Sequence, residues 1–322
     1  MLLIQNNSST HVSIDAVKEF ETILLQESVM QVAGAFPISL FIYRLCRKLG
    51  FSTIRKTVAR YAKKPLKDKK HLFMVMMGLD VYGYRPYGLF TNHNRSIYLF
   101  DAWEKDHEKI TTFVRDFGID YVFVSSSQAA ERLNRLLGQS KFYWIPEGIN
   151  PSEYKYVSFE KKDIDVLALG RRYDDYHHAI VSFMEKNHYV YLYEKEKGNI
   201  IFPTRDEFID GLARTKISIC VPSNITHPDR AGDIETMTIR YLQSMISKCL
   251  IVGRAPKEMI ELFGYNPVIE IDETRLSEQL NDILKNYADY VSLIEKNYRQ
   301  VIQHHTWKNR WQQIKDIYTL KT

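Results

Sequence analysis

The sequence predicts an α/β protein with two parallel-sheet domains, and two observations support this fold class. From residue 71 onward, short apolar runs of strand length alternate with segments of helical periodicity. The alternation stops at residues 149–162, which are charged and lack a strong period, and then it restarts. Two such series divided by a linker are typical of two Rossmann-like domains, each a parallel sheet covered by helices.

The composition is that of a globular protein from a reducing compartment. Hydrophobic residues make up 45% of the 322 residues and charged residues 26%, which is enough to build the cores of two domains. The three cysteines, Cys46, Cys220 and Cys249, are far apart, which argues against a disulfide framework and against a cysteine zinc site. The first residues do not resemble a signal peptide, and no apolar run reaches the roughly 18 residues that span a bilayer. These features favour a cytoplasmic protein.

The first domain is expected over residues 1–150 and should begin with helices. Residues 13–32 have apolar side chains at helical spacing, and Pro37 stands at a favourable first position of a second helix. The expected strands cover 71–77, 96–100, 121–124 and 142–145, and the helices between them cover 105–117 and 128–137.

The second domain is expected over residues 151–300, followed by a C-terminal helix over 301–322. Its central segment is 232–254, where a polar loop leads through a helix that begins at Glu235 and ends at Lys248 into the buried strand 249–252. The other expected strands cover 165–169, 189–193, 217–221 and 268–271. The other expected helices cover 176–186, 205–215, 257–263, 275–297 and 298–320.

Residues 44–70 form a basic segment, with eleven lysines and arginines against one acid, Asp68. One interpretation is a solvated helical face. The other is a surface that binds anionic lipid head groups or a polyanionic acceptor, which would place the protein at the inner face of the membrane. Nucleic acid is not expected as a partner, because no recognition motif accompanies the charge.

Ligands of parallel sheets bind beyond the carboxyl ends of the strands, so the loops there supply the candidate site. Arg171 and Arg172 follow Gly170 and are predicted to bind a diphosphate. The polar loop 222–235 adds Arg230 as a further phosphate ligand. The alternative for these arginines is a surface turn without function. The backbone amides at the start of the next helix are expected to point at a phosphate; they belong to Thr236, Met237 and Thr238.

Three carboxylate or aromatic positions are the other candidates. Glu235 is predicted to contact ligand hydroxyls, although a helix often carries an ordinary acid in its first turn. In the first domain, the loop that begins at Gly78 could fold over a ligand. Trp103 offers a stacking surface, and Asp101 is the candidate catalytic base or acceptor-orienting residue.

Several other chemistries are not expected. The chain has no phosphate-binding loop of the GxxxxGK[ST] form, no GxGxxG after a strand, no HExxH and no GxSxG. Asp163 and Asp165 have the spacing of a metal–nucleotide motif, but they stand at the entry of a strand rather than at its carboxyl end. We therefore expect no metal and no cofactor.

Three stretches in the second half resemble a known family: DVLALGRRYDD, TIRYLQSMISKCLIVGRAPKEMIELF and QHHTWKNRW. They are similar to the GT-B glycosyltransferases of the group 1 / family 4 kind, especially their CgeB-like branch. DYVFVSSSQAAERL and FYWIPEGINPSEY resemble the family more loosely, and the resemblance covers roughly residues 120–315. It implies the GT-B fold, in which two domains face a cleft and a C-terminal helix returns to the N-terminal domain.

The resemblance also implies a function: transfer of a sugar from a nucleotide sugar in the second domain to an acceptor in the first, without a metal ion. The family's two-glutamate motif falls on Glu235, which would face the sugar, and on position 243, where Gln243 would bind the ribose. Lys248 replaces a family glycine. The acceptor class is a glycan or a lipid-linked or surface polymer. An inverting enzyme would need Asp101 as a base, whereas a retaining enzyme would not.

Two other functions stay open. One is a non-catalytic GT-B subunit that binds a nucleotide sugar or a glycan for a partner enzyme, which Gln243 favours. The other is a GT-B sugar-nucleotide epimerase, which would form its product without an acceptor.

Overall fold

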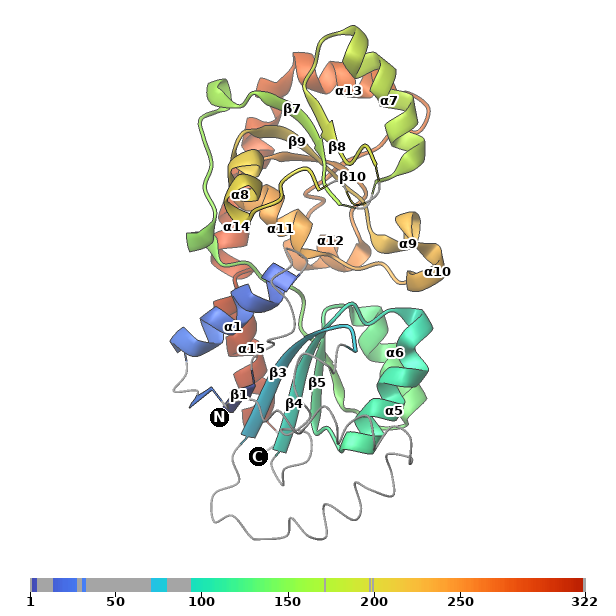
Figure 1. The fold of residues 1–322 in the computed structure, drawn as a ribbon, viewed down its shortest axis with the longest axis vertical. Coiled ribbons are helices and arrows are strands. Elements are labelled where there is room, and N and C mark those ends of the chain that lie inside the picture. Colours follow the sequence, from blue (N-terminus) through green and yellow to red (C-terminus); the bar gives the residue numbers. More distant parts are fainter. Residues whose placement is uncertain are drawn as a thin grey trace. The chain divides into compact units, whose positions relative to one another are not determined.

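The computed structural model describes residues 2–4, 14–27, 31–32, 71–79, 94–170, 172–196, 198 and 200–320. It divides into an N-terminal unit, Met1–Pro146 with Trp311–Thr322, and a C-terminal unit, Glu147–Arg310. Each unit contains one parallel sheet with helices on its faces (Figure 1). This architecture confirms the fold class that the sequence predicts. The basic segment 44–70 and the second helix expected from Pro37 lie outside the described residues.

The N-terminal unit is built on a six-stranded sheet in the order β2-β1-β3-β4-β5-β6, and all its strand pairs are parallel. The first two strands along the chain are short and were not predicted, because neither forms an apolar run of strand length. Its strands are β1 (Leu2–Ile4), β2 (Gln31–Val32), β3 (His71–Met77), β4 (Asn94–Phe100), β5 (Tyr121–Val124) and β6 (Phe142–Trp144), and its helices are α1 (Asp15–Glu27), α5 (His107–Phe117) and α6 (Ser127–Leu137).

The C-terminal helix α15 (Trp307–Thr319) packs on the sheet of the N-terminal unit, as expected. The Trp311 ring lies 5.6 Å from the Phe73 ring, and the Tyr318 ring lies 5.7 Å from Phe123. Phe20 of α1 packs against Phe73 as well, so α1 and α15 cover the same face. Figure 1 shows α5 and α6 on the other face. Aromatic side chains from both ends of the unit thus form one core.

The C-terminal unit has a five-stranded parallel sheet in the order β11-β10-β9-β7-β8. Two helices, α7 and α13, cover one face, where their apolar side chains form a common core with the strands. On the other face α8, α11 and α12 pack against the strands. The strands are β7 (Ile164–Ala168), β8 (Tyr191–Tyr193), β9 (Thr215–Cys220), β10 (Leu250–Gly253) and β11 (Ile269–Glu270). The helices are α7 (Asp174–Lys186), α8 (Arg205–Ala213), α9 (Ser223–Thr226), α10 (Pro228–Ala231), α11 (Ile239–Ile246), α12 (Lys257–Phe263), α13 (Leu276–Lys285) and α14 (Val291–His304).

The predicted helical boundary at residues 297 and 298 is wrong, because α14 runs through it. The chain breaks instead after α13 and again between α14 and α15. At the second break, Thr306 and Asn309 cap each other: the Asn309 side chain accepts from the Thr306 amide at 2.9 Å, and Thr306 Oγ1 accepts from the Asn309 amide at 3.2 Å. This reciprocal capping starts a new helix without a proline or glycine, so periodicity alone did not reveal it.

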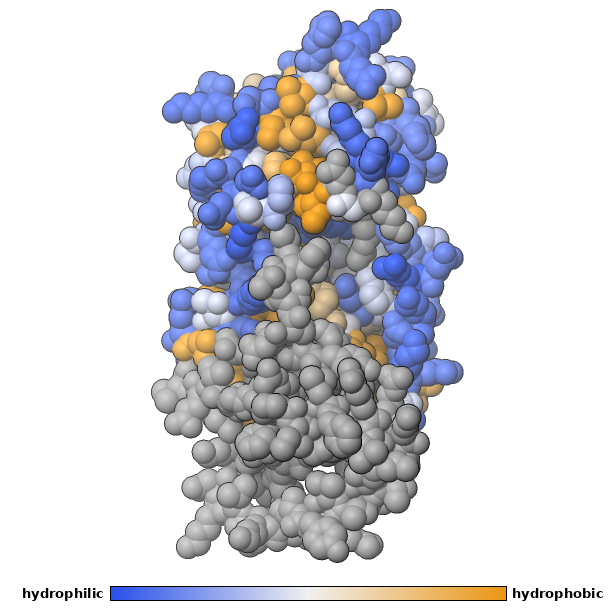
Figure 2. Space-filling view, in the orientation of Figure 1, coloured by the Kyte–Doolittle hydropathy of each residue, from blue (hydrophilic) through white to orange (hydrophobic). Residues whose placement is uncertain are grey.

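One edge of the C-terminal sheet carries exposed apolar side chains. In the coloured part of Figure 2, mostly hydrophilic residues surround apolar side chains that gather in the C-terminal unit, around β7 and β8. β8 is an edge strand of its sheet, and Val190 and Ile200 on either side of it are each 44% exposed. Among the described residues, no helix is long and apolar enough to cross a membrane.

Candidate functional site

The order of the C-terminal sheet places a topological switch point between β7 and β9. Numbered along the chain, its strands run 2-1-3-4-5 across the sheet, so that the first and third strands are neighbours. The connection after β7 leads to α7 on one face, and the connection after β9 leads to α11 on the other. Open α/β sheets bind ligands outside the carboxyl ends of the strands at such a point. The loops after β7 and β9 therefore form the centre of the candidate site.

The loop after β7 begins at Gly170, whose φ of +71° is a conformation that favours glycine. Arg171 lies outside the described residues. Arg172 Nε donates to Asp174 Oδ1 at 2.6 Å, and its Nη1 donates to the Glu194 carbonyl at 3.3 Å. The guanidinium holds the pKa of the Asp174 carboxyl below its usual range. Arg172 is thus anchored to the start of α7 and to the residue that follows β8.

Arg240, in the first turn of α11, lies at the same switch point, and the sequence analysis did not single it out. Its Nη1 donates to the Leu169 carbonyl at 2.8 Å. The same atom lies 3.6 Å from where a Cβ on Gly170 would stand. The sequence did not mark it, because its partner Leu169 is 71 positions away and the helix was expected to begin at Glu235, which would not place Arg240 in the first turn.

The helix expected to begin at Glu235 begins at Ile239 instead, with Thr238 as its N-cap residue. The Met237 amide donates to Glu258 Oε1 at 2.9 Å, and the Ile239 amide donates to Glu147 Oε2 at 2.5 Å. The first amides of a helix have no carbonyl partner within it, and these carboxylates satisfy the amide of Ile239, the first residue of α11, and that of Met237 just before it. Both glutamates are buried. The phosphate contacts predicted for the amides of Thr236 and Thr238 stay predictions, and the amide of Met237 already has an acceptor.

Glu235 and Arg230 both belong to the segment that follows β9, but they differ in solvent exposure. Glu235 is half-buried, and its Oε2 accepts from the Lys257 amide, the first of α12, at 3.3 Å. Its carboxylate therefore lies beside the loop that leaves β10, at the carboxyl end of the sheet. Arg230 is exposed on the short helix α10. The sugar contact of Glu235 and the phosphate contact of Arg230 stay predictions.

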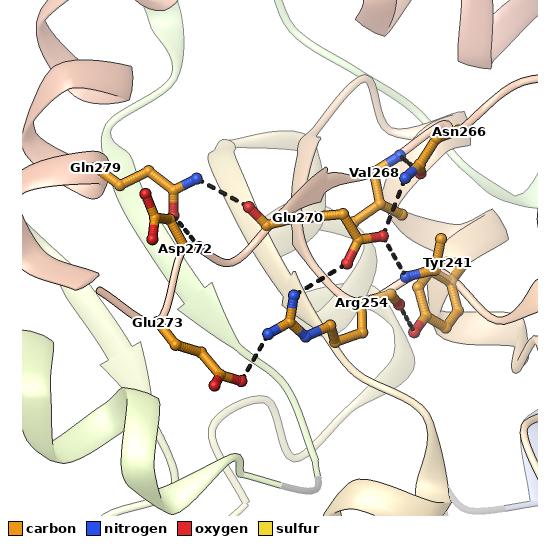
Figure 3. Close-up of polar contacts among 9 residues, drawn as sticks. Tyr241, Arg254, Asn266, Val268, Glu270, Asp272, Glu273 and Gln279 are labelled. Atoms are coloured by element: carbon orange, nitrogen blue, oxygen red, sulfur yellow. Dashed lines mark hydrogen bonds and ion pairs between the residues drawn. The ribbon is translucent and has the colours of Figure 1, made fainter. Parts of the chain in front are cut away.

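A network of ion pairs connects the carboxyl ends of β10 and β11 (Figure 3). Arg254 donates to Glu270 at 3.3 Å and to Glu273 at 2.6 Å. Glu270 also accepts from the Ala255 amide at 3.0 Å, and the Tyr241 hydroxyl of α11 donates to the Arg254 carbonyl at 2.6 Å. The network fixes the loops on this side of the site to each other and to α11. Sequence reasoning missed it because the partners lie far apart along the chain.

Two residues at positions where the family has other side chains take defined places. Gln243 is 7% exposed, and its Nε2 donates to the Tyr154 hydroxyl at 3.1 Å. Its ribose contact stays a prediction. Lys248 has a φ of +53°, the left-handed conformation that a glycine adopts readily. Its Nζ pairs with Glu295 at 2.6 Å, so the turn after α11 is formed without a glycine.

The predicted site residues of the N-terminal unit gather at the carboxyl ends of β3 and β4. The Gly78 amide donates to the Phe100 carbonyl at 3.0 Å, immediately before Asp101. Asp101 has a φ of +53°, and the Trp103 amide donates to its carbonyl at 2.8 Å. His107 donates to the Ala102 carbonyl at 3.2 Å, and burial lowers the pKa of the imidazole. The structure thus brings Gly78, Asp101 and Trp103 to one edge, in a turn held by α5; their roles stay predictions.

The charged groups at the amino end of β7 are paired within the protein. Asp163 accepts from Arg214, and Lys216 Nζ lies 2.7 Å from Asp165 Oδ1. In the part of the chain that the structure describes, no group of three or more His, Cys, Asp or Glu side chains is placed to hold a metal ion.

The family model described as glycosyl transferase-like matches residues 159–316. This segment, just under half of the chain, is therefore similar to a glycosyl transferase-like domain. It contains every strand of the C-terminal sheet, and with them the switch point and the loops around it. A search of curated proteins found no match.

Solved structures show that the described part of the chain has the GT-B fold of glycosyltransferases. HepE of Anabaena, in complex with UDP-glucose, superposes with a TM-score of 0.58 at 9% identity, and 99% of each chain is covered. Sucrose-phosphate synthase from Thermosynechococcus elongatus gives a TM-score of 0.53 at 12% identity, covering 84% of this chain and 78% of the synthase. At such identities the likeness establishes the fold alone.

A third similar structure is that of S. aureus TarM, in complex with fondaparinux, alpha-GlcNAc-glycerol and UDP. Its TM-score is 0.54 at 14% identity. The match covers 81% of this chain, which spans only 58% of the TarM chain. The glycosyl transferase-like domain thus shares its architecture with proteins whose structures hold UDP or UDP-glucose.

Proposed function

We propose that this protein is a glycosyltransferase that moves a sugar from a nucleotide-sugar donor to a glycan or lipid-linked acceptor, without a metal ion. The observation that supports this most is the coincidence of two independent features. The glycosyl transferase-like domain spans residues 159–316, and its sheet has its switch point where Arg172 and Arg240 lie beside Gly170. Cations at this edge suit the diphosphate of a nucleotide sugar.

The proposed roles follow from the chemistry of glycosyl transfer. Negative charge builds on the leaving diphosphate, and positioned cations stabilise it in the transition state. Positive charge builds on the sugar ring, where the carboxylate of Glu235 would balance it. Gln243 would contact the ribose, and Gly78 and Trp103 the sugar or the acceptor. If the reaction inverts the anomeric centre, Asp101 would accept the proton of the attacking hydroxyl. The diphosphate ligands would come from Arg171, Arg172, Arg230 and the amides of Thr236 and Thr238.

The position of Gln243 favours a second candidate, a non-catalytic subunit that binds a nucleotide sugar or a glycan. Its side chain is buried and bonded to Tyr154. A subunit of this kind would bind a nucleotide sugar but would neither hydrolyse nor transfer it. Turnover by the purified chain alone therefore separates the two functions.

The experiment begins with a thermal-shift screen of nucleoside diphosphates and nucleotide sugars, including UDP-glucose. A ligand present at 100 times its Kd stabilises the folded state by about 2.7 kcal/mol, which a thermal shift detects. Hydrolysis and transfer of the best donor are then measured for the wild type and two variants. Glu235→Ala should lower turnover by about 100-fold if its carboxylate stabilises the transition state. Glu261→Ala, exposed on α12, should be as active as the wild type.

Equal turnover by Glu235→Ala and the wild type would remove Glu235 from the site. Binding of a nucleotide sugar without hydrolysis or transfer to any glycan or lipid-linked acceptor would favour the non-catalytic subunit. Binding of no nucleotide at all would contradict the proposed function.

A further inference from the structure

The N-terminus of α11, the usual place for an anion in a loop–helix–strand segment, is already occupied in this chain. Glu147 accepts from the Ile239 amide, and Glu258 accepts from the Met237 amide. Their side chains are 5% and 4% exposed, so both carboxylates are held inside the protein. A helix N-terminus attracts anions through its amides and its dipole, and here the chain's own carboxylates use that attraction. A ligand diphosphate at the same amides would meet two negative charges.

Arg240 directly follows Ile239 and carries a cation at the start of α11. Its guanidinium reaches from the first turn of α11 to the carboxyl end of β7, where Nη1 donates to the Leu169 carbonyl at 2.8 Å. Among the residues that the structure describes, this is its one hydrogen bond, and no carboxylate pairs with it. Arg172 and Arg254, at the same edge of the sheet, both pair with carboxylates. Of these three arginines, Arg240 is therefore the one whose charge no carboxylate of the described residues neutralises.

The backbone next to Arg240 allows a ligand to come close. Gly170 has no side chain between the strand end and the guanidinium, and a Cβ there would lie 3.6 Å from Arg240 Nη1. The loop that Gly170 begins leaves the sheet at the switch point between β7 and β9. Glycine at such a place lets a ligand approach the main chain, and an arginine fork offers several N–H groups to phosphate oxygens.

We propose that Arg240 binds the diphosphate of a nucleoside diphosphate or its sugar derivative at the switch point between β7 and β9, in place of the occupied amides of Met237 and Ile239. The inference rests on the proposed function, because it assigns one contact of the donor. It moves that contact from the helix N-terminus to a side chain, and it makes the affinity for the diphosphate depend on one charge.

The test compares a nucleoside diphosphate with its own nucleoside, so that the diphosphate contact is isolated. Calorimetry gives the dissociation constants of UDP and uridine, and likewise of GDP and ADP with their nucleosides, for the wild type and Arg240→Gln. The loss of a hydrogen bond between two charged groups should weaken diphosphate binding by about 10- to 100-fold. Nucleoside binding should change less than about 2-fold, since uncharged ligands gain nothing from the guanidinium.

Two further variants separate ligand binding from folding. Arg240→Lys keeps the charge and a donor for the Leu169 carbonyl, so it should fold and retain most of the diphosphate affinity. Arg214→Gln removes an exposed arginine that pairs with Asp163 at the amino end of β7, and it should bind like the wild type. A role of Arg240 in folding alone would weaken the diphosphate and the nucleoside equally.

Each possible outcome either supports or overturns the inference about Arg240. A selective loss of diphosphate affinity in Arg240→Gln, with affinity kept in Arg240→Lys, supports the inference. Unchanged diphosphate affinity in Arg240→Gln, or an equal loss for both ligands, overturns it while leaving the proposed function intact. If the wild type binds none of the three nucleoside diphosphates or their sugar derivatives, the proposed function falls and the inference falls with it.

Discussion

His305 should make the C-terminal unit sensitive to acid, and its surroundings set the size of the effect. The imidazole is 2% exposed and stacks on Phe263 with ring centroids 4.3 Å apart. Arg310 Nη2 lies 2.7 Å from His305 Nδ1. A guanidinium only donates hydrogen bonds, so Nδ1 must accept and the ring must be neutral with its proton on Nε2. Burial, and then the charge of Arg310, lower the pKa of His305 from 6.5 to about 3.

The direction of the effect follows from the two pKa values. Above pH 6.5, His305 is neutral in both the folded and the unfolded protein and makes no pH-dependent contribution. Below pH 6.5, His305 is protonated in the unfolded state, whereas in the folded state it stays neutral until the pH nears 3. The free energy of unfolding therefore falls as the pH falls through this window. One unit of pKa difference is worth about 1.4 kcal/mol, so lowering the pH from 6.5 to 5 should cost about 2 kcal/mol.

The assay counts protons and does not require a two-state transition. The wild type and His305→Asn are unfolded in concentrated urea at pH 5 in a pH-stat, and the acid needed to hold the pH is measured. Asparagine carries its side-chain oxygen near the place of Nδ1, so it can accept from Arg310, and it does not titrate. Unfolding of the wild type should take up about one proton more than unfolding of the variant.

The same comparison at pH 8 is the control, because His305 is neutral there in both states. The two proteins should then take up equal numbers of protons. Equal uptake at pH 5 as well would refute the reasoning, since it would mean that folded His305 already carries a proton beside the guanidinium.

Two further predictions concern lysines in unusual surroundings. Lys162 Nζ is buried and donates to three backbone carbonyls at 2.8 to 3.0 Å, so Lys162→Met should lower the free energy of unfolding of the C-terminal unit by about 3 kcal/mol. Hydrogen exchange of the β7 and β9 amides measures this, and equal protection in Lys162→Met and in the exposed control Lys161→Met would contradict it. Lys248 combines a left-handed backbone with cation–π contacts at 4.1 and 4.7 Å, so both Lys248→Gly and Lys248→Ala should destabilise the protein. The alanine variant keeps the backbone strain and should be less stable than the glycine variant by about 1 kcal/mol, and equal melting temperatures would count against this explanation.

The sequence predicted the fold where burial alone decides the structure. β3, β5 and β10 are apolar runs because both faces of a parallel strand are covered, and such runs are visible without a structure. The two short strands β1 and β2 escaped, because they depend on pairing, β1 with β3 and β2 with β1, rather than on their own composition. The late start of α11 escaped as well, because it is set by two carboxylates from distant parts of the chain.

The candidate site was predictable to the level of loops but not of contacts. The rule that ligands bind beyond strand ends directed attention to the loops after β7 and β9, which lie at the switch point of the sheet, and in the other unit it selected Gly78 and Asp101, which lie together. It could not select Arg240, whose partner Leu169 is 71 positions away. It also could not show that Arg172 is bonded to Asp174. The pairing of Arg240 depends on the closed fold, and the bond of Arg172 depends on the local backbone after β7, and the strand-end rule specifies neither.

The C-terminal motif QHHTWKNRW acts on the candidate site through Glu147. Arg310, 1% exposed, donates through Nε to the Glu147 carbonyl at 3.1 Å. The carboxylate of the same glutamate accepts from the Ile239 amide, which begins the helix that carries Arg240. Gly148, the residue after Glu147, packs closely against the start of α15. A Cβ on Gly148 would lie only 2.8 Å from the amide nitrogen of Trp307. The resemblance of this motif to a glycosyltransferase family therefore has a physical basis inside the C-terminal unit: the motif holds the residue that fixes the start of α11.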